Sequence, residues 1–280
     1  MMQNQLMIDV GGHWLAVVFY IAAAITNAVG IVFERPRAEK RSYRMAVIGL
    51  VIHGLALLYR WVVVTGHGPY ITRYEVFSSN SWITLCLFLV FLRFFPRIRL
   101  ASIVIFPATF LFIACGIFFN PATIKLPATF KSIWLVAHIL FIKIAVATLL
   151  IALAFSVFYV LKKRRRYKWL KRLPELEVID VYAYRFAGFG FIFWTNAILS
   201  GSIWAYQSWG RFWGWDPVET WSFITWLFFG MYLHLRRFFH LRGERATAVY
   251  ILCFVMSIMT LFYLPLLDIS IHSEYFVRSP

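Results

Sequence analysis

The sequence predicts an all-α, polytopic integral membrane protein with about eight transmembrane helices and both termini on the outer side. Three observations support this prediction. First, the 280 residues are 61% hydrophobic and only 14% charged, whereas soluble domains have about 45–50% apolar and about 25% charged residues. Second, apolar stretches of about 20 residues, the length that crosses a bilayer as a helix, recur along the chain. Third, basic residues gather in alternate connections between these stretches.

Eight apolar stretches qualify as spans, although the third of them is short. They lie near residues 14–33, 45–64, 80–95, 100–119, 130–161, 186–206, 220–238 and 247–267. We expect residues 1–280 to form a single membrane domain without a removable signal peptide, because no basic region precedes the first stretch. The composition excludes a disordered chain, a disulfide scaffold and a cytosolic α/β enzyme.

The net charge of +16 reflects membrane topology rather than a nucleic-acid partner. Of the 28 Lys and Arg residues, 21 fall in four alternate connections. These connections are 34–44, 93–99, the basic inner loop 162–185, and 236–245. Because basic loops stay on the cytoplasmic side, we expect a cytoplasmic (inner) membrane protein. The segments facing the outer, periplasm-like side are then the outer loop 65–80 together with 120–130, 201–220 and 268–280.

Half of the tryptophans lie in one outer segment. Residues 204–226 read WAYQSWGRFWGWDPVETWSFITW and contain six of the twelve Trp residues. An aromatic belt explains one or two of these at a helix end, but not a loop with glycine spacers. Asp216 and Pro217 predict an N-cap and a first helical position, and Glu219 completes a capping box. We expect the loop 201–220 to form an aromatic sheet along the surface, which suits a flat polycyclic ligand, a lipid or quinone, or a packing role.

Two histidines flank this loop on the predicted outer side. His138 lies a turn or two inside the outer end of the fifth span, and His272 follows the eighth span. Two neutral imidazoles on opposite sides of a haem iron would form a bis-histidine site, whereas the simpler alternative is a pair of interfacial polar residues. His53 lies well inside the second span, where an ionisable residue indicates either a functional site or a hydrogen bond to a neighbouring helix.

Further polar residues lie near the outer end of the second span. The Gly-His-Gly-Pro sequence at 66–69 predicts that the helix ends before His67, which we place in the first outer hairpin. Arg60 follows His53 by seven residues and lies on the same helical face. Its guanidinium is placed to pair with Glu75 or a haem propionate, or to snorkel to the surface.

Four other ionisable residues receive simpler interpretations. Lys143 lies deep in the fifth span, where we prefer an interhelical hydrogen bond. His234 and His240 stand among the arginines of an inner turn, and we expect them to be solvated. His13 begins the first span and receives no role.

Two stretches resemble those of a known haem-handling family. WGRFWGWDPVETW at 209–221 is similar to the WWD motif of proteins used in cytochrome c maturation, with Val218 where Lys is common. HGLALLYRWVVVTGHGPYITRYE at 53–75 resembles the H…RW…GHxP…YE pattern of the CcsA-type (ResC-type) members of System II, with Thr72 where Asn is expected. The length and the eight spans also fit this branch.

The resemblance implies a haem site on the outer face. It makes His138 and His272 the axial ligands of the haem iron, and His53 the ligand of a transmembrane haem. The implied platform for the haem ring consists of Trp204, Trp209, Trp213, Trp215, Asp216, Glu219 and Trp221. The implied supporting residues are Arg60, His67 and Glu75.

The resemblance also implies a membrane subunit of the System II cytochrome c synthase, which binds haem b and supports its thioether attachment to the CxxCH of apocytochrome c. The implied partners are a CcsB-type (ResB-type) membrane subunit, apocytochrome c, thiol-reducing thioredoxin-like proteins and the lipid bilayer. Positioning and axial ligation, rather than a side-chain nucleophile, would then be the contribution of the chain. One alternative is a haem transporter or chaperone without ligase activity. A second is a b-type quinol-linked electron-transfer protein, which is disfavoured because no helix carries two well-spaced histidines.

Overall fold

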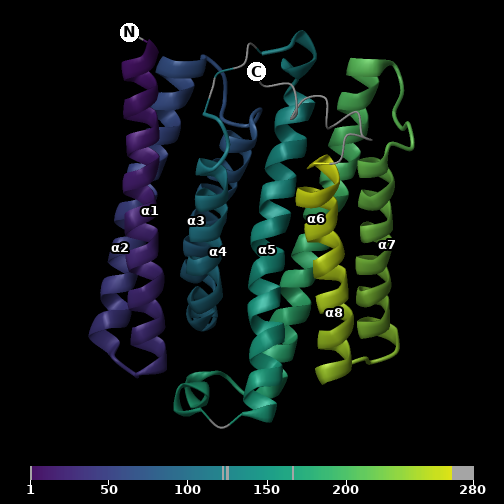
Figure 1. Cartoon of the computed structure of the whole chain (residues 1–280). Helices are drawn as coiled ribbons and strands as arrows, with labels where there is room; N and C mark the ends of the chain where they lie inside the picture. The colour runs from purple at the N-terminus through teal and green to yellow at the C-terminus, as the bar shows by residue number, and fades with distance from the viewer. Residues whose placement is uncertain (1, 122, 124–125, 166, 267–280) are drawn as a thin grey trace. The chain divides into compact units, whose positions relative to one another are not determined.

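The structure is a computed structural model that describes residues 2–121, 123, 126–165 and 167–266. All regular elements in these ranges are helices and none is a strand, so the all-α prediction is confirmed (Figure 1). The α-helices are α1 (Met2–Val32), α2 (Pro36–Tyr59), α3 (Arg73–Phe94), α4 (Ser102–Ile117), α5 (Ile133–Arg164), α6 (Leu176–Trp209), α7 (Pro217–Phe238) and α8 (Gly243–Ile258).

Short helical turns extend or join these helices. Two of them are π-helical and continue α2 and α8 directly, namely η1 (Arg60–Thr65) and η5 (Met259–Tyr263). The 3-10 turns are η2 (Pro96–Ala101), η3 (Ala128–Phe130), η4 (Lys168–Arg172) and η6 (Leu264–Leu266). Because π-helical turns are rare and frequently lie at functional sites, the turn at Arg60 marks a candidate site.

Seven helical segments in the described part of the chain are long and apolar enough to cross a membrane. They comprise α1, α2 with η1, α3, η2 with α4, α5, α6, and α8 with η5. α7 has 22 residues but is not among them, because its Trp, Tyr, Thr and His residues make it less apolar. These helices support a polytopic membrane protein, while the outer placement of both termini stays a prediction.

Several helices begin earlier than the apolar stretches predicted. α1 begins at Met2 rather than near residue 14, and α3 begins at Arg73, which shortens the first outer loop from 65–80 to 66–72. For α3, an apolar window misses the first turns because capping bonds, rather than hydropathy, begin this helix. At the start of α3 the Thr72 side chain accepts a hydrogen bond from the backbone of Glu75, and the Glu75 side chain completes the capping box.

The tryptophan-rich loop and the basic inner loop are also shorter than predicted. α6 continues to Trp209 and α7 begins at Pro217, so the expected loop 201–220 is reduced to residues 210–216. In the predicted inner loop 162–185, α5 continues to Arg164 and α6 begins at Leu176. Polar and basic side chains therefore continue the helices beyond the apolar spans.

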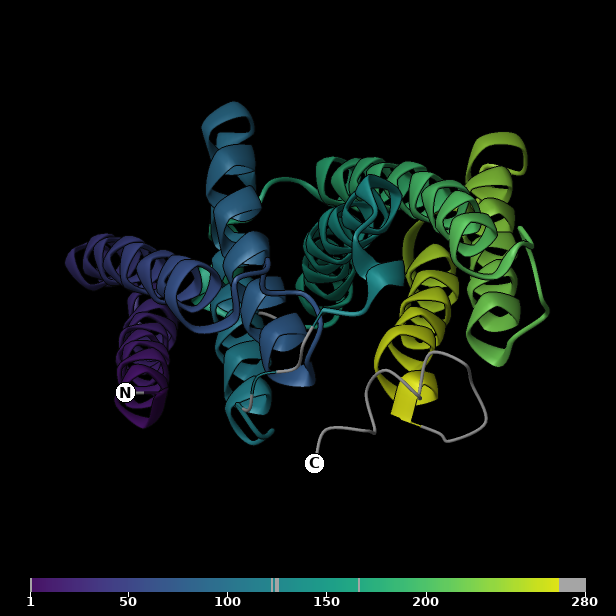
Figure 2. The same ribbon diagram turned by 90° about the horizontal axis from the view of Figure 1, so that it is seen from above.

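The chain divides into two compact units, Met1–Leu126 and Pro127–Arg278, which the sequence analysis did not anticipate. In the first unit α1 packs along α2 and against α4, and α3 packs along α4 (Figure 2). In the second unit α5 packs along α6, and α8 lies against both α5 and α7 (Figures 1 and 2).

Polar contacts join helices within each unit. In the first unit Asn27 of α1 donates to the Ser42 hydroxyl of α2 at 3.0 Å, and Ser102 at the start of α4 donates to Asn27 at 3.1 Å. In the second unit Arg236 donates to both carboxylate oxygens of Asp180 at 2.7 Å, which joins α7 to α6. Such bonds satisfy side chains that an apolar surrounding would otherwise leave without partners.

The turn between α1 and α2 depends on the close approach of their backbones. A Cβ atom on Gly30 would lie 2.5 Å from the backbone nitrogen of Glu39, so we expect Gly30→Ala to force the two helices apart. Overpacking of this kind costs about 1–3 kcal/mol. Thermal unfolding in detergent, followed by circular dichroism, should show a lower Tm for this variant.

Gly11→Ala is the matched control, because Gly11 is also in α1 and a Cβ there would meet nothing within 4 Å. The control should unfold at or slightly above the parent temperature, since alanine favours helix. Equal stability of the two variants would contradict the close approach.

Candidate functional site

The tryptophan-rich loop of the second unit is fixed at both ends by backbone geometry. α6 ends at Gly210, whose φ of 73° is left-handed and whose N–H donates to the Tyr206 carbonyl at 2.9 Å. α7 begins with Asp216 as its N-cap, and the Asp216 carboxylate accepts the N–H of Val218 at 3.0 Å. Glu219 completes a capping box, so the predicted start of this helix is confirmed.

Trp215 has an unusual backbone conformation within this loop. Its φ of 56° lies in the left-handed region, which a bulky residue adopts at a cost of about 1–3 kcal/mol. On either side of it, the N–H groups of Gly214 and Asp216 donate to the same carboxylate oxygen, Oε2 of Glu219, at 2.8 and 3.3 Å. The capping residue of α7 therefore holds both neighbours of Trp215.

Two of the predicted platform tryptophans anchor the end of α6. Trp204 is buried, and its indole N–H donates to the Thr129 carbonyl at 2.9 Å. Its ring lies 5.8 Å from the ring of Phe130 and 4.9 Å from that of Trp209, in an edge contact. Trp204 therefore joins the end of α6 to η3, and Trp209 packs against Trp204.

The other tryptophans lie at or near the surface. The rings of Trp213 and Trp215 are 6.0 Å apart and nearly perpendicular, at 84°, and Trp213 meets Phe223 of α7 at 77°. Trp215 is 69% exposed and Trp221 is 42% exposed. The expectation of an aromatic sheet is therefore wrong, because these rings meet edge to face, as the charge distribution of aromatic rings favours.

His138 of α5 is held by α6. Its Nδ1 lies 2.7 Å from the Ala197 carbonyl oxygen, and a Cβ on Gly201 would approach the same nitrogen to 2.7 Å. Because a carbonyl only accepts, Nδ1 carries the hydrogen of this bond. A backbone carbonyl that holds one ring nitrogen is typical of metal-ligating histidines.

His138 contacts α6 at Gly201, before this helix reaches the tryptophan-rich loop. Gly201 precedes the last residue of α6 by eight positions, which is about 12 Å along a helix axis. The end of α8 approaches the same end of the unit, since Thr260 of η5 donates to the Trp221 carbonyl at 3.4 Å. His272, the predicted second ligand, lies outside the described residues.

His53 belongs to the first unit and is fully buried there. One ring nitrogen, Nδ1, lies 3.2 Å from the Tyr20 hydroxyl of α1, and Nε2 lies 2.8 Å from the Ser78 hydroxyl of α3. The alternative interpretation, a hydrogen bond to a neighbouring helix, therefore describes His53 in this structure. Ligation of haem iron by His53 stays a prediction.

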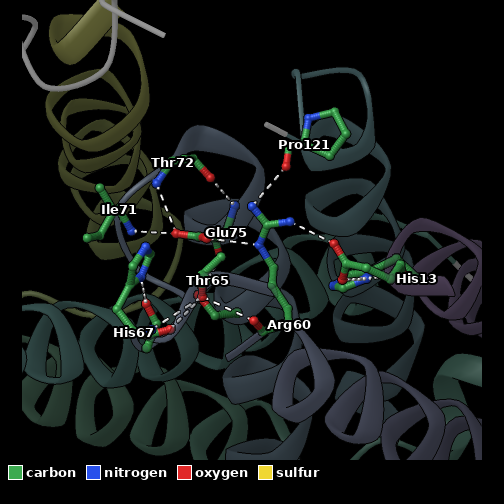
Figure 3. Close-up of polar contacts among 11 residues, drawn as sticks. His13, Arg60, Thr65, His67, Ile71, Thr72, Glu75 and Pro121 are labelled. Carbon is green, nitrogen blue, oxygen red and sulfur yellow. Dashed lines mark hydrogen bonds and ion pairs between the residues drawn. The ribbon is translucent and has the colours of Figure 1, made fainter. Parts of the chain in front are cut away.

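Arg60 forms the centre of a buried ion cluster (Figure 3). Its guanidinium donates to Glu75 of α3 at 2.8 Å and to Asp9 of α1 at 2.6 Å. A third bond, at 3.1 Å, reaches the carbonyl of Pro121, beyond the end of α4. The predicted pairing of Arg60 with Glu75 is thus confirmed, and snorkelling is excluded because the side chain is fully buried.

Glu75 also shapes the first outer loop. Its Oε2 accepts the N–H groups of Ile71 and Thr72 at 2.9 and 3.1 Å, so the residues before α3 are tied to the ion cluster (Figure 3). Thr72 stands where the resemblance led us to expect Asn, and threonine and asparagine are both good N-caps. Burial, with the Glu75 charge, raises the pKa of the neighbouring Tyr70 hydroxyl above its ordinary value.

His67 lies in this loop, as predicted. The helix ends at Gly66, which has a left-handed φ of 70°, and the Thr65 hydroxyl donates to the His67 carbonyl at 2.9 Å. The His67 ring is buried, with Nδ1 2.9 Å from the Gly68 carbonyl. The predicted supporting residues Arg60, His67 and Glu75 therefore lie in one region of the first unit.

Asp9 and His13 are buried site residues that the sequence analysis missed. His13 Nδ1 lies 2.8 Å from the Asp9 carbonyl oxygen, and its ring is 5.4 Å from the ring of His53 and 5.0 Å from that of Tyr74. In the described part of the chain, neither His13 Nε2 nor the Tyr74 hydroxyl makes a hydrogen bond. The signal was the spacing of Asp9 and His13, four residues apart on one helical face, but the first helix was expected to begin after both.

The other ionisable residues considered from the sequence differ in burial. Lys143 is buried in α5, whereas His234 and His240 are exposed, as predicted. In the described part of the chain, no group of three or more His, Cys, Asp or Glu residues is arranged to hold a metal ion. Arg60 and His53 belong to the first unit, while His138 and the tryptophan-rich loop belong to the second.

The fold and these sites define a class of multi-pass helical membrane protein with a histidine and a tryptophan-rich loop at one end of its second unit. Residues 2–272 match the model of the cytochrome C assembly protein family, so the chain belongs to this family. Its role is therefore in cytochrome c assembly.

Similar proteins share the name cytochrome c biogenesis protein CcsA. The one from Chlamydomonas reinhardtii is 34% identical over 202 residues, which cover 70% of this chain and 57% of that protein. The one from Prochlorococcus marinus (strain AS9601) is 29% identical over 288 residues, or 92% of each chain. The one from Spinacia oleracea is 45% identical over 102 residues, or 36% of this chain and 32% of that protein. These similarities identify this chain with the CcsA-type members of the family.

The ion cluster at Arg60 generates a stability prediction. Arg60→Met leaves the carboxylates of Asp9 and Glu75 buried without their cation, and loss of one partner from a buried pair costs about 3–5 kcal/mol. We expect a large fall in thermal stability in detergent. The triple variant Asp9→Asn, Arg60→Met, Glu75→Gln removes all three charges and should recover most of the loss.

The control for this series is Arg41→Met, because Arg41 is an exposed arginine of α2 and its loss should be neutral. If the triple variant is no more stable than Arg60→Met alone, uncompensated charge is not the cause of the instability.

The N-cap of α3 generates a smaller prediction. Thr72→Ala removes the acceptor for the Glu75 N–H and should lower the unfolding free energy by about 1 kcal/mol. Thr72→Asn keeps an acceptor at the N-cap and should remain near the parent. The same thermal measurement checks both variants, and an unstable Asn variant would count against the capping explanation.

Proposed function

We propose that this chain is the haem-handling membrane subunit of a System II cytochrome c synthase, and that haem b is its substrate on the outer face. The observation that carries the proposal is the state of His138. Its Nδ1–H is held by the Ala197 carbonyl, which fixes the orientation of the ring, and Nε2 is the nitrogen that we propose to bind the iron. Membership of the cytochrome c assembly family supports the same function.

The tryptophan-rich loop supplies the apolar contacts in this proposal. Haem is flat and largely apolar, and indole rings offer broad apolar surfaces with few rotatable bonds. Trp215 and Trp221 are the more exposed candidates, while Trp204 and Trp209 pack against each other. His272 is proposed as the second axial ligand because it follows the segment that ends beside Trp221.

The chemistry at this site would be addition of cysteine thiols to the haem vinyl groups. Each S–H of the apocytochrome CxxCH adds across one vinyl double bond, so a C–S bond forms and the thiol hydrogen ends on the adjacent vinyl carbon. This addition needs no oxidant, but it needs reduced thiols, which explains the proposed thioredoxin-like partners. The chain's own residues would orient the haem rather than attack it.

A second membrane chain belongs to the proposal. We expect a CcsB-type (ResB-type) subunit to be needed for activity, with both chains in the cytoplasmic membrane and the haem site facing the periplasm. His53 is the proposed ligand of a transmembrane haem that supplies the outer site. Ligation there would require its ring to give up the bond to Tyr20 or to Ser78.

The test is the haem content of the purified full chain, with and without the co-expressed partner. His138→Ala and His272→Ala should each weaken haem binding by about tenfold or more, because each removes an iron ligand. His53→Ala should reduce the delivery of haem to the outer site. His240→Ala serves as the control, since this exposed histidine lies at the opposite end of α7 from the tryptophan-rich loop.

Unchanged haem content and spectrum in both His138→Ala and His272→Ala would overturn the outer site. The synthase assignment is tested separately with an apocytochrome that carries CxxCH. Covalent haem on this substrate supports a synthase, whereas bound haem that never forms a thioether would identify the chain as a transporter or chaperone.

A further inference from the structure

The capping carboxylate of α7 has a second effect on the tryptophan-rich loop. A capping box needs only the bond from the N-cap N–H, which Glu219 receives from Asp216 at 3.3 Å. The same oxygen also accepts the Gly214 N–H, at the shorter distance of 2.8 Å. This additional bond is not needed to start the helix, and it closes the backbone around Trp215.

The closed backbone explains how Trp215 keeps a conformation that bulky residues avoid. Its φ is 56°, and a left-handed residue places its side chain differently from an extended one. Asp216 next to it is buried, whereas Trp215 is 69% exposed and its ring stands at 84° to the ring of Trp213. The carboxylate of Glu219 therefore binds the backbone on both sides of the residue that carries the exposed indole.

We propose that Glu219 is a positioning residue for Trp215, and that it acts on haem through this indole rather than by contact. The inference rests on the proposed function for its ligand, haem b. Its structural part, the control of Trp215 by Glu219, is independent of any ligand. The two parts therefore require separate measurements.

The structural part is tested by fluorine NMR of the full chain labelled with 5-fluorotryptophan. The Trp215 resonance is assigned by its loss in Trp215→Phe, and that of the fully buried Trp194 by its loss in Trp194→Phe. Glu219→Ala should shift or broaden the Trp215 resonance and leave the Trp194 resonance in place. Glu219→Gln, which keeps a neutral acceptor oxygen, should give a smaller change in the same direction.

The matched control is Glu177→Ala, because Glu177 is an exposed glutamate in the first turn of α6. It should leave both resonances unchanged. A Trp215 resonance that does not respond to Glu219→Ala would overturn the proposal. So would a change that moves Trp194 equally, since that would indicate a general loss of structure.

The functional part is tested by haem b titration of Trp215→Leu, Glu219→Ala and the double variant. Each single variant should bind haem about tenfold more weakly, which corresponds to the loss of a charge-assisted bond or a ring contact. The double variant should be no weaker than the single ones, because Glu219 acts through Trp215. Additive losses would contradict this route, while a parent chain that binds no haem would overturn the proposed function and leave the NMR result valid.

Discussion

The guanidinium of Arg60 is the constraint on which the first unit depends. Arginine stays protonated at any physiological pH, so its charge must be compensated wherever the chain buries it. Here α1, α3 and Pro121, beyond the end of α4, all bring an oxygen to it. Because breaking one of these pairs would leave a charge in an apolar surrounding, these elements must meet at Arg60. Glu75, which is paired with Arg60, also accepts the N–H groups of Ile71 and Thr72, so the loop before α3 is tied to the same ion cluster.

In the second unit, several polar side chains find their partners among backbone atoms. Glu219 and Asp216 accept the N–H groups at the start of α7, and His138 donates to a carbonyl of α6. Each of these side chains satisfies the backbone and, in doing so, acquires a fixed orientation. A histidine whose Nδ1–H is bound in this way has a fixed ring orientation, as metal-ligating histidines commonly do.

The sequence predicts what depends on local pattern. The Asp216–Glu219 capping box and the end of the second helix before His67 follow from turn chemistry, and both are confirmed. Hydropathy predicts eight spans, and in the described part of the chain seven helical segments are long and apolar enough to cross a membrane, while α7 is not. The sequence does not predict that α1 extends to Met2 and so includes Asp9, because the ion pair of Asp9 with Arg60 depends on the tertiary fold rather than on apolar composition. Asp9 and His13 were missed for this reason. The edge-to-face contacts of the tryptophans were also missed, since ring orientation depends on tertiary neighbours.

The backbone of Trp215 bears on whether the tryptophan-rich loop is an interfacial aromatic belt or a surface for a flat ligand. Tryptophans of an interfacial belt sit on ordinary helix ends, where no strain is needed to place an indole at the headgroup level. Trp215 instead occupies a left-handed conformation that two bonds to Glu219 maintain. A sequence that needed only an interfacial anchor would place glycine or asparagine at such a position and tryptophan elsewhere. Strain retained at an exposed, clamped ring agrees with the proposal that this ring binds a flat ligand in one orientation.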